Sequence, residues 1–184
     1  MPNPSLDQDE VLRFWFIETK PSQWWATDPR FDALIAERFG ALLDAAGRCE
    51  LYRWRSQPRG RLAEIIVLDQ FSRNVYRGTP KAFSNDPLAL ALAQEAVADG
   101  HDRALEGMER AFLYMPYMHS ESAVVHQEGE RLFASLDLPD VHKSALHHKS
   151  IIDRFGRYPH RNEVLGREST AEELAFLREP GSSL

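Results

Sequence analysis

The chain of 184 residues has little or none of several features that define common protein classes. It contains one cysteine, Cys49, which excludes an intramolecular disulfide and a cysteine-based metal site. Such cysteine use favours a reducing compartment, so we expect a cytoplasmic location. No apolar run approaches the ~20 residues of a membrane-spanning helix. The N-terminal segment is acidic where a signal peptide is basic, and we expect no membrane association.

Positive charge is also in short supply. The chain has 22 lysines and arginines against 28 aspartates and glutamates, a formal net charge of −6. An acidic chain has no overall positive electrostatic potential to attract nucleic acid, so we expect no general nucleic-acid binding. Glycine-rich phosphate loops, nucleophile elbows and His-Glu-x-x-His motifs are absent as well. We expect no cofactor and no metal, with a metal site assembled across helices from His119, His148 or Asp69 as the alternative.

What is present is the composition of a globular protein. Hydrophobic residues make up 43% of the chain and charged residues 27%, which excludes a wholly disordered chain. A chain of this length buries a sizeable core and forms one domain in most cases. We predict a single domain over residues 1–184, with disordered ends at 1–4 and 179–184.

Helical signals occur along nearly the whole chain. Apolar residues recur at helical spacing, and no segment of useful length alternates with a period of two. The pattern predicts an all-α fold of about eight helices packed as antiparallel hairpins, either as a bundle or as a short stack. Cap signals mark the ends: Ser5 with Gln8, Asp28-Pro29, Asp86-Pro87 and Ser169 with Glu172 at starts, and Gly156 at an end.

The first candidate segment of a functional site runs from residue 62 to 77. Its apolar residues cover most of the helix circumference, so the helix is expected to be packed on several sides, with Asp69 inside the run. Arg73 follows four residues later and Arg77 one turn further, so both can lie on the face of Asp69. Gln70 beside the pair favours a ligand-binding pocket. The structural alternative is an intrahelical salt bridge at the domain edge.

The second segment ends in His119-Ser120-Glu121, just after an apolar stretch. Pro116 interrupts the backbone hydrogen bonds of a helix, so a helix junction is expected here. A histidine with an ordinary pKa near 6.5 can serve as acid or base, which makes His119 a candidate general base with Glu121 or Asp69 as its partner. The structural alternative is a hydrogen-bonded histidine without a catalytic role.

The third segment is rich in cations although the chain is acidic. Residues 142–167 hold four of the seven histidines together with six lysines and arginines. Forked guanidinium groups suit a phosphate or carboxylate, whereas the bland alternative is a solvated helix face. Gly156 and Pro159 are expected to fix the intervening turn. The candidate ligand-binding residues here are Arg154, Arg157, His160, Arg161 and Asn162.

Charged groups inside apolar runs are costly unless they are partnered. We therefore predict that the three segments converge on one buried polar site. The four tryptophans are expected to anchor the core, with Trp24-Trp25 as candidates for the mouth of a groove.

Several stretches of the chain together carry a family resemblance: Val11 to Phe16, Trp24-Trp25, Leu68 to Phe83, Phe112 to Glu121, Arg154 to Asn162 and Leu165 to Thr170. In these stretches the chain resembles the bacterial domain-of-unknown-function family 924, which implies an all-α, tetratricopeptide-like fold and a family without an established activity. The resemblance supplies no catalytic residue.

Three functions are compatible with these observations. The leading hypothesis is a helical module whose arginine-rich pocket binds a small anionic ligand or an acidic peptide. The second is a hydrolase or transferase for an anionic substrate, with His119 as general base. The third is a protein-interaction scaffold in which the polar cluster fixes helix packing.

Overall fold

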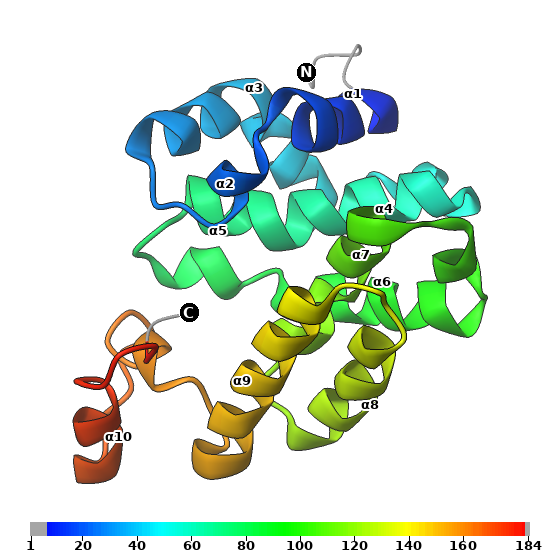
Figure 1. Ribbon diagram of the computed structural model, residues 1–184. Helices are drawn as coiled ribbons and strands as arrows, with labels where there is room; N and C mark the ends of the chain where they lie inside the picture. The colour runs from blue at the N-terminus through cyan, green and yellow to red at the C-terminus, as the bar shows by residue number, and fades with distance from the viewer. Residues whose placement is uncertain (1–6, 183–184) are drawn as a thin grey trace.

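The computed structural model describes residues 7–182 and consists of α-helices joined by turns and short helical segments (Figure 1). The described residues contain no strand, so the all-α prediction is confirmed. The single domain and the tetratricopeptide-like arrangement stay predictions. The helices are α1 Gln8–Arg13, α2 Pro21–Trp24, α3 Pro29–Gly47, α4 Pro58–Ile66, α5 Ser72–Val75, α6 Asp86–Ala98, α7 Gly107–His119, α8 Ala123–Ala134, α9 Pro139–Phe155 and α10 Ala171–Phe176.

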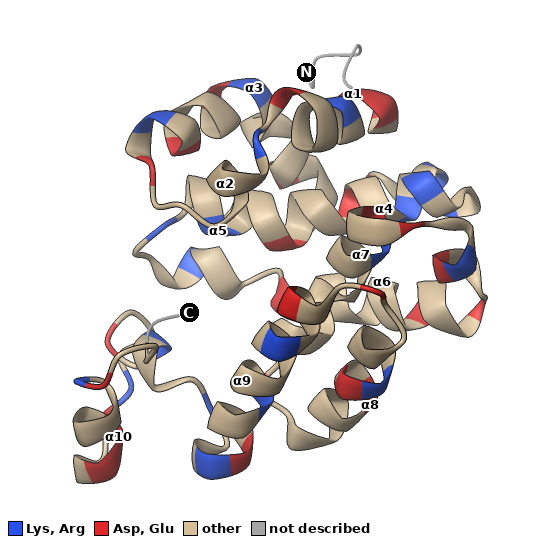
Figure 2. Cartoon of the chain, in the orientation of Figure 1, with Lys and Arg blue, Asp and Glu red and all other residues tan. Residues whose placement is uncertain are grey.

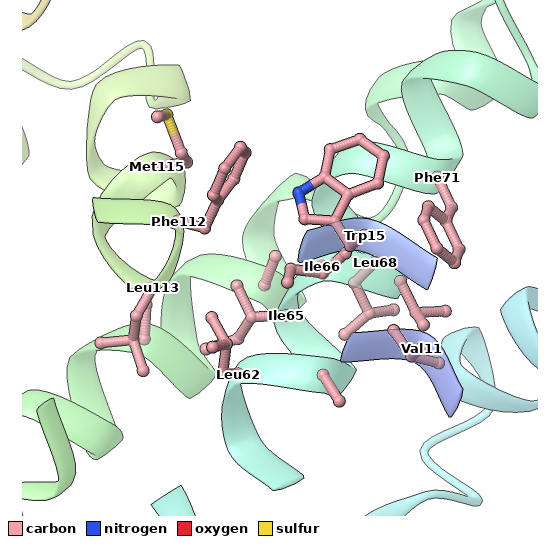
Figure 3. Packing of buried hydrophobic residues seen from close by; sticks show 14 of the residues in the cluster. Val11, Trp15, Leu62, Ile65, Ile66, Leu68, Phe71, Phe112, Leu113 and Met115 are labelled. Atoms are coloured by element: carbon pink, nitrogen blue, oxygen red, sulfur yellow. The ribbon is translucent and has the colours of Figure 1, made fainter. Parts of the chain in front are cut away.

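A long central helix organises the core. It comprises α4, a π-helical turn at Val67–Phe71 and α5, and its apolar side chains are buried on several sides, as the sequence predicts. Figure 3 shows Leu62 and Ile65 of this helix packed between the N-terminal helix, which carries Val11, and Leu113 of α7. The π-helical turn holds Asp69 and Gln70, so the polar residues lie where the helical hydrogen-bond pattern changes.

An aromatic cluster fixes α2 against α7. The Trp15 ring is fully buried and lies 5.6 Å from the Phe112 ring, measured between centroids. The Trp24 ring lies 5.0 Å from Phe112, and its indole N–H donates to the Trp15 carbonyl at 3.0 Å. Trp25, in contrast, is 60% exposed. The tryptophans are thus core anchors only in part.

The last third of the chain packs on the end of α7. Helices α8 and α9 form an antiparallel pair beside α7 (Figure 1), and α9 ends at Gly156 in the left-handed conformation, with a φ of 69°, as predicted. Beyond it, the chain turns so that Tyr158 joins a small apolar cluster with Ile151, Ile152 and Phe176. This turn brings residues 158–161 back to α7.

Two of the predicted helix caps are wrong. Asp86 is the first residue of α6 instead of its cap, because its carboxylate bonds to arginines described below. Helix α10 is capped by Thr170 together with Glu173, one residue later than the predicted Ser169 and Glu172. The predicted cap at Asp28 is confirmed by its bond from the Arg30 amide, and Ser5 lies outside the described residues.

Of the predicted disordered ends, residues 1–4 and 183–184 lie outside the described part of the chain. Residues 179–182 turn back toward the protein, where the Ser182 hydroxyl donates to the Leu177 carbonyl at 3.1 Å. Within residues 7–182, none of the helices has the length and the apolar character that crossing a bilayer requires.

Candidate functional site

A cavity of about 620 Å³ lies where α2, the central helix, α7, α9 and the turn after α9 meet. This volume is typical of small-molecule sites. Residues from all three predicted segments line it, so the predicted convergence takes place for part of each set. The predicted site residues in its lining are Gln70, Arg73, Arg77, His119, His160 and Arg161.

A buried aspartate holds the imidazole of His119. Asp69 is 1% exposed, and its Oδ1 lies 2.8 Å from Nδ1 of His119 and 3.2 Å from the Arg73 guanidinium. The other carboxylate oxygen accepts a bond from the Gln70 side-chain amide at 2.7 Å. With Nδ1 directed at the carboxylate, Nε2 is the ring nitrogen left for the cavity, and it has no hydrogen-bond partner among the described residues.

The local charges set the protonation of this pair. Burial alone raises the pKa of Asp69, but the charge of Arg73 and the bond with His119 outweigh it and hold that pKa below its usual range. Burial, with the charge of Arg73, lowers the pKa of His119 below 6.5 even though Asp69 opposes the shift. At neutral pH the pair is therefore a carboxylate and a neutral imidazole whose Nδ1–H donates to it.

Asp86 joins two of the predicted arginines. Its two oxygens accept two parallel bonds from Arg73 at 2.9 and 3.0 Å, and Oδ2 also accepts from Nη1 of Arg161 at 3.3 Å. Arg161 also donates from Nη2 to the backbone carbonyl of His119 at 3.0 Å. The Asp69–Arg73 pair predicted from the i, i+4 spacing is therefore confirmed, although Arg73 makes its bidentate bond with Asp86.

Arg161 is nearly buried and incompletely paired. It is 6% exposed, and its Nε is a buried donor without a partner among the described residues. The guanidinium lies over the rings of Phe83 and Tyr158, at 4.5 and 4.6 Å from their centroids. Burial and the like charge of Arg73 lower the pKa of Arg161. The cavity wall thus contains a guanidinium with unused donor capacity.

His160 lies beside this arginine. Within the described part of the chain, its Nδ1 is also buried without a hydrogen-bond partner. Burial, followed by the charge of Arg161, lowers the pKa of His160 to about 4. Burial lowers the pKa of His148, which lines the same cavity, to about 3. These imidazoles are neutral at pH 7 and can donate or accept hydrogen bonds.

Arg77 lines the cavity, but its hydrogen bonds go to a carboxylate on α3. Its Nε and Nη2 bond to the two oxygens of Asp32 at 2.6 and 2.9 Å. The Asn74 amide donates to the same carboxylate at 2.7 Å. Arg77 therefore joins α3 to the end of the central helix, whereas the sequence predicted it as a second cation beside Asp69 and Arg73.

Glu121 does not reach His119. Its carboxylate accepts two bonds from Arg167, at 2.6 and 2.9 Å, and a third from the Tyr158 amide at 2.7 Å. Asp69 is therefore the partner of His119, and Glu121 instead fixes the turn after α9.

Three more predicted ligand-binding residues lie outside the cavity lining. Arg157 is paired with Glu173 at the start of α10, Arg154 is paired with the exposed Glu172, and Asn162 bonds to Ser169 and Arg167. These contacts join α9 to α10. The cation-rich segment is thus divided between the cavity, whose lining includes His148, His160 and Arg161, and a structural network.

The end of α7 explains why distant segments meet. The last carbonyls of a helix have no intrahelical partner. Here the Met118 carbonyl accepts from the Tyr158 hydroxyl, the His119 carbonyl from Arg161, and the Ser120 carbonyl lies 2.8 Å from Nε2 of His126. The turn after α9 thereby caps α7 and places Arg161 next to the Asp69–His119 pair.

The cavity also has an apolar wall, which the pattern of charged residues in the sequence does not predict. Trp24, Trp25, Phe83, Met115 and Met118 line it. The Trp25 ring is stacked on the Phe112 ring at a centroid distance of 5.9 Å and an angle of 7°. The only sequence signal for this wall was the expectation that Trp24-Trp25 lie at a groove mouth.

Asp86 was missed as a site residue because its position before Pro87 is typical of a helix cap.

Figure 2 shows basic and acidic residues interspersed over the helices. Within residues 7–182, no three histidine, cysteine, aspartate or glutamate side chains form a group that could hold a metal ion.

Fold and site together define an all-α protein with a polar cavity and a buried Asp–His pair. The chain belongs to a family of bacterial proteins of unknown function, DUF924, whose model matches residues 11–181. It is similar to the solved structure of a protein of unknown function from Agrobacterium tumefaciens. The two are 38% identical with a TM-score of 0.87, over 93% of this chain and 96% of the other. No curated protein matches the chain. The family predicted from the sequence is confirmed.

Proposed function

We propose that the cavity is the active site of a hydrolase or transferase in which His119 acts as general base. The observation that carries this proposal is the 2.8 Å contact between Nδ1 of His119 and the buried Asp69. A carboxylate on one ring nitrogen fixes the tautomer and orientation of a histidine and stabilises the imidazolium that forms when the other nitrogen takes a proton. Nε2 is then available to a water molecule or a substrate hydroxyl.

The surroundings supply the other parts of such a reaction. Proton removal by Nε2 converts water or a hydroxyl into a nucleophile, and His119 returns the proton to the leaving group. Negative charge develops on the attacked group, and the Nε donor of Arg161 is a candidate to stabilise it. Gln70 acts as a positioning residue because it donates to the oxygen of Asp69 that His119 does not use.

A binding module for a small anion or an acidic peptide is the second candidate. It is favoured by three arginines in the wall of one cavity, Arg73, Arg77 and Arg161. Each of them is already paired with a carboxylate, so the donor they still offer to a ligand is the unpartnered Nε of Arg161, and a positively charged cavity wall alone does not distinguish a binding module from an enzyme. The contact between Asp69 and His119 makes the enzyme the better-supported function. The protein-interaction scaffold and the cytoplasmic location stay predictions.

Hydrolysis of a panel of carboxylic esters, phosphomonoesters and amides, compared between the wild type and His119→Ala, tests the enzyme. We expect a rate at least 100-fold lower in the variant, which is the usual contribution of a general base. Asp69→Asn should lower the maximal rate without a matching change in KM. His147→Ala, which removes an exposed histidine on α9, is the matched control and should retain the wild-type rate.

The pH profile adds a second readout. Because the pKa of His119 is lowered, the rate should fall on the acidic side with an apparent pKa below 6.5. Equal rates in the wild type and His119→Ala, or no turnover in the panel by either protein, would contradict the enzyme. Circular dichroism verifies that the variants are folded.

A further inference from the structure

The cavity is lined by the aromatic pair Trp24 and Trp25 and also by the incompletely paired Arg161. Along α7, Phe112 faces Trp24 of α2 and the residue after it, Trp25. Met115 comes one turn later, and His119 ends the helix. Seven residues separate Phe112 from His119, which corresponds to roughly 10 Å of helix rise. The cavity therefore changes from aromatic to polar over about the length of a medium acyl chain.

The exposure of Trp25 indicates that the aromatic part is open to a ligand. This indole is 60% exposed although one face is stacked on Phe112. Trp24 and the flexible thioethers of Met115 and Met118 continue the surface into the cavity. An apolar group placed there removes both its own surface and that of the indole from water, which favours binding.

The polar part requires an anionic or strongly accepting group. Arg161 is nine-tenths buried, and its Nε has no partner among the described residues. The buried Nδ1 of His160 has none there either. Asp86 is shared between two guanidinium groups and makes its bidentate bond with Arg73, so Arg161, with a single longer contact of 3.3 Å to Asp86, retains a donor for a ligand oxygen. A cationic ligand end would meet this guanidinium unfavourably.

We infer that the cavity accepts an elongated amphipathic monoanion, with an apolar tail along Trp24, Trp25 and Met115 and an anionic head at Arg161 beside His119. This inference deepens the proposed function, since the same cavity holds the substrate, and it names the substrate class as an anionic phosphate ester with a medium-length apolar tail.

Isothermal titration with sodium octanoate tests the binding mode without reference to catalysis. Acetate carries the head without the tail, and octylammonium carries the tail with the opposite charge. We expect each of these two probes to bind the wild type at least tenfold more weakly than octanoate does. Equal affinity for octanoate and octylammonium, or no binding of octanoate, would overturn the inference.

Two variants locate the tail. Trp25→Ala should weaken octanoate binding at least fivefold, with little cost to folding because the side chain is mostly exposed. Tyr52→Ala is the matched control, because Tyr52 is an aromatic residue of similar exposure, 58%, that does not line the cavity. The affinity of the Tyr52→Ala variant for octanoate should stay within twofold of the wild type. Equal losses in both variants would indicate nonspecific association and refute the proposed tail site.

The head is located with Arg161→Lys, which keeps the charge but removes the forked donors, compared with Arg154→Lys at the exposed pair with Glu172. Only Arg161→Lys should weaken octanoate binding, and equal affinities of the two variants would place the head elsewhere.

The experiments distinguish failure of the proposed enzyme from failure of the proposed ligand class. Octanoate binding that His119→Ala retains, without turnover of any ester, contradicts the enzyme alone. Turnover that needs His119 but shows no preference for tailed anions contradicts the present inference alone.

Discussion

Substitution of Asp86 by asparagine is the most informative perturbation of the polar cluster. The change keeps the shape of the side chain and removes the charge that two arginines share. Arg73 would lose its bidentate partner, with bonds of 2.9 and 3.0 Å, and Arg161 would lose its carboxylate contact at 3.3 Å. Asp69 would then be the remaining carboxylate of this cluster, opposite two guanidinium groups.

The magnitude follows from burial. Removal of one partner of a buried ion pair costs about 3–5 kcal/mol, because it leaves an uncompensated charge. Asp86 keeps 16% of its side-chain surface exposed, so we expect the lower end, about 3 kcal/mol. For a chain of this size, that loss corresponds to a fall in Tm of roughly 6–12 °C.

Urea unfolding monitored by circular dichroism measures the change. The double variant Asp86→Asn with Arg161→Gln should lose less stability than the sum of the two single variants, because the second change removes the charge that the first leaves unpaired. Glu172→Gln is the control, since it removes a carboxylate from an exposed pair and should cost less than about 1 kcal/mol. A loss below about 1 kcal/mol for Asp86→Asn would refute the reasoning.

Two further predictions concern stability. Burial lowers the pKa of His148 to about 3 and that of His160 to about 4, so below pH 6.5 the unfolded chain binds protons that the folded chain does not. The unfolding free energy should therefore fall as the pH is lowered, by up to about 1.4 kcal/mol per pH unit for each histidine. Constant stability between pH 6.5 and 4.5 would contradict this. Gly60→Ala should cost about 1–3 kcal/mol in urea unfolding because its Cβ would overlap the Trp54 carbonyl, whereas Gly40→Ala, whose Cβ meets open space, should be neutral or stabilising.

Local signals in the sequence predicted the fold class well. The helical periodicity and the cap at Asp28 depend on neighbouring residues, which a sequence displays directly. The cap at Asp86 was wrong for a tertiary reason, because its carboxylate bonds to Arg73, thirteen residues earlier in the chain, and to Arg161. A local motif does not reveal a distant partner that competes for the same oxygen atoms.

The candidate site was predicted in part. The i, i+4 spacing revealed the pair of Asp69 and Arg73, and the position of His119 after an apolar helix predicted its place at a junction. The sequence could not tell which arginines of the cation-rich segment face the cavity. Gly156 reverses the chain after α9, and the resulting direction sends Arg161 inward and Arg157 toward α10.

The π-helical turn at Val67–Phe71 has a consequence for variation in the length of this chain. One residue of an α-helix corresponds to a rotation of about 100°. Deletion of a single residue within this turn would allow an unbroken α-helix but would rotate the face that carries Arg73 relative to the face that carries Leu62. Such a deletion would make the backbone more regular, but it would separate the Asp69–His119 pair from the residues that surround it. The π-helical turn therefore lets one end of the central helix pack in the apolar core while the other end lines the polar cavity.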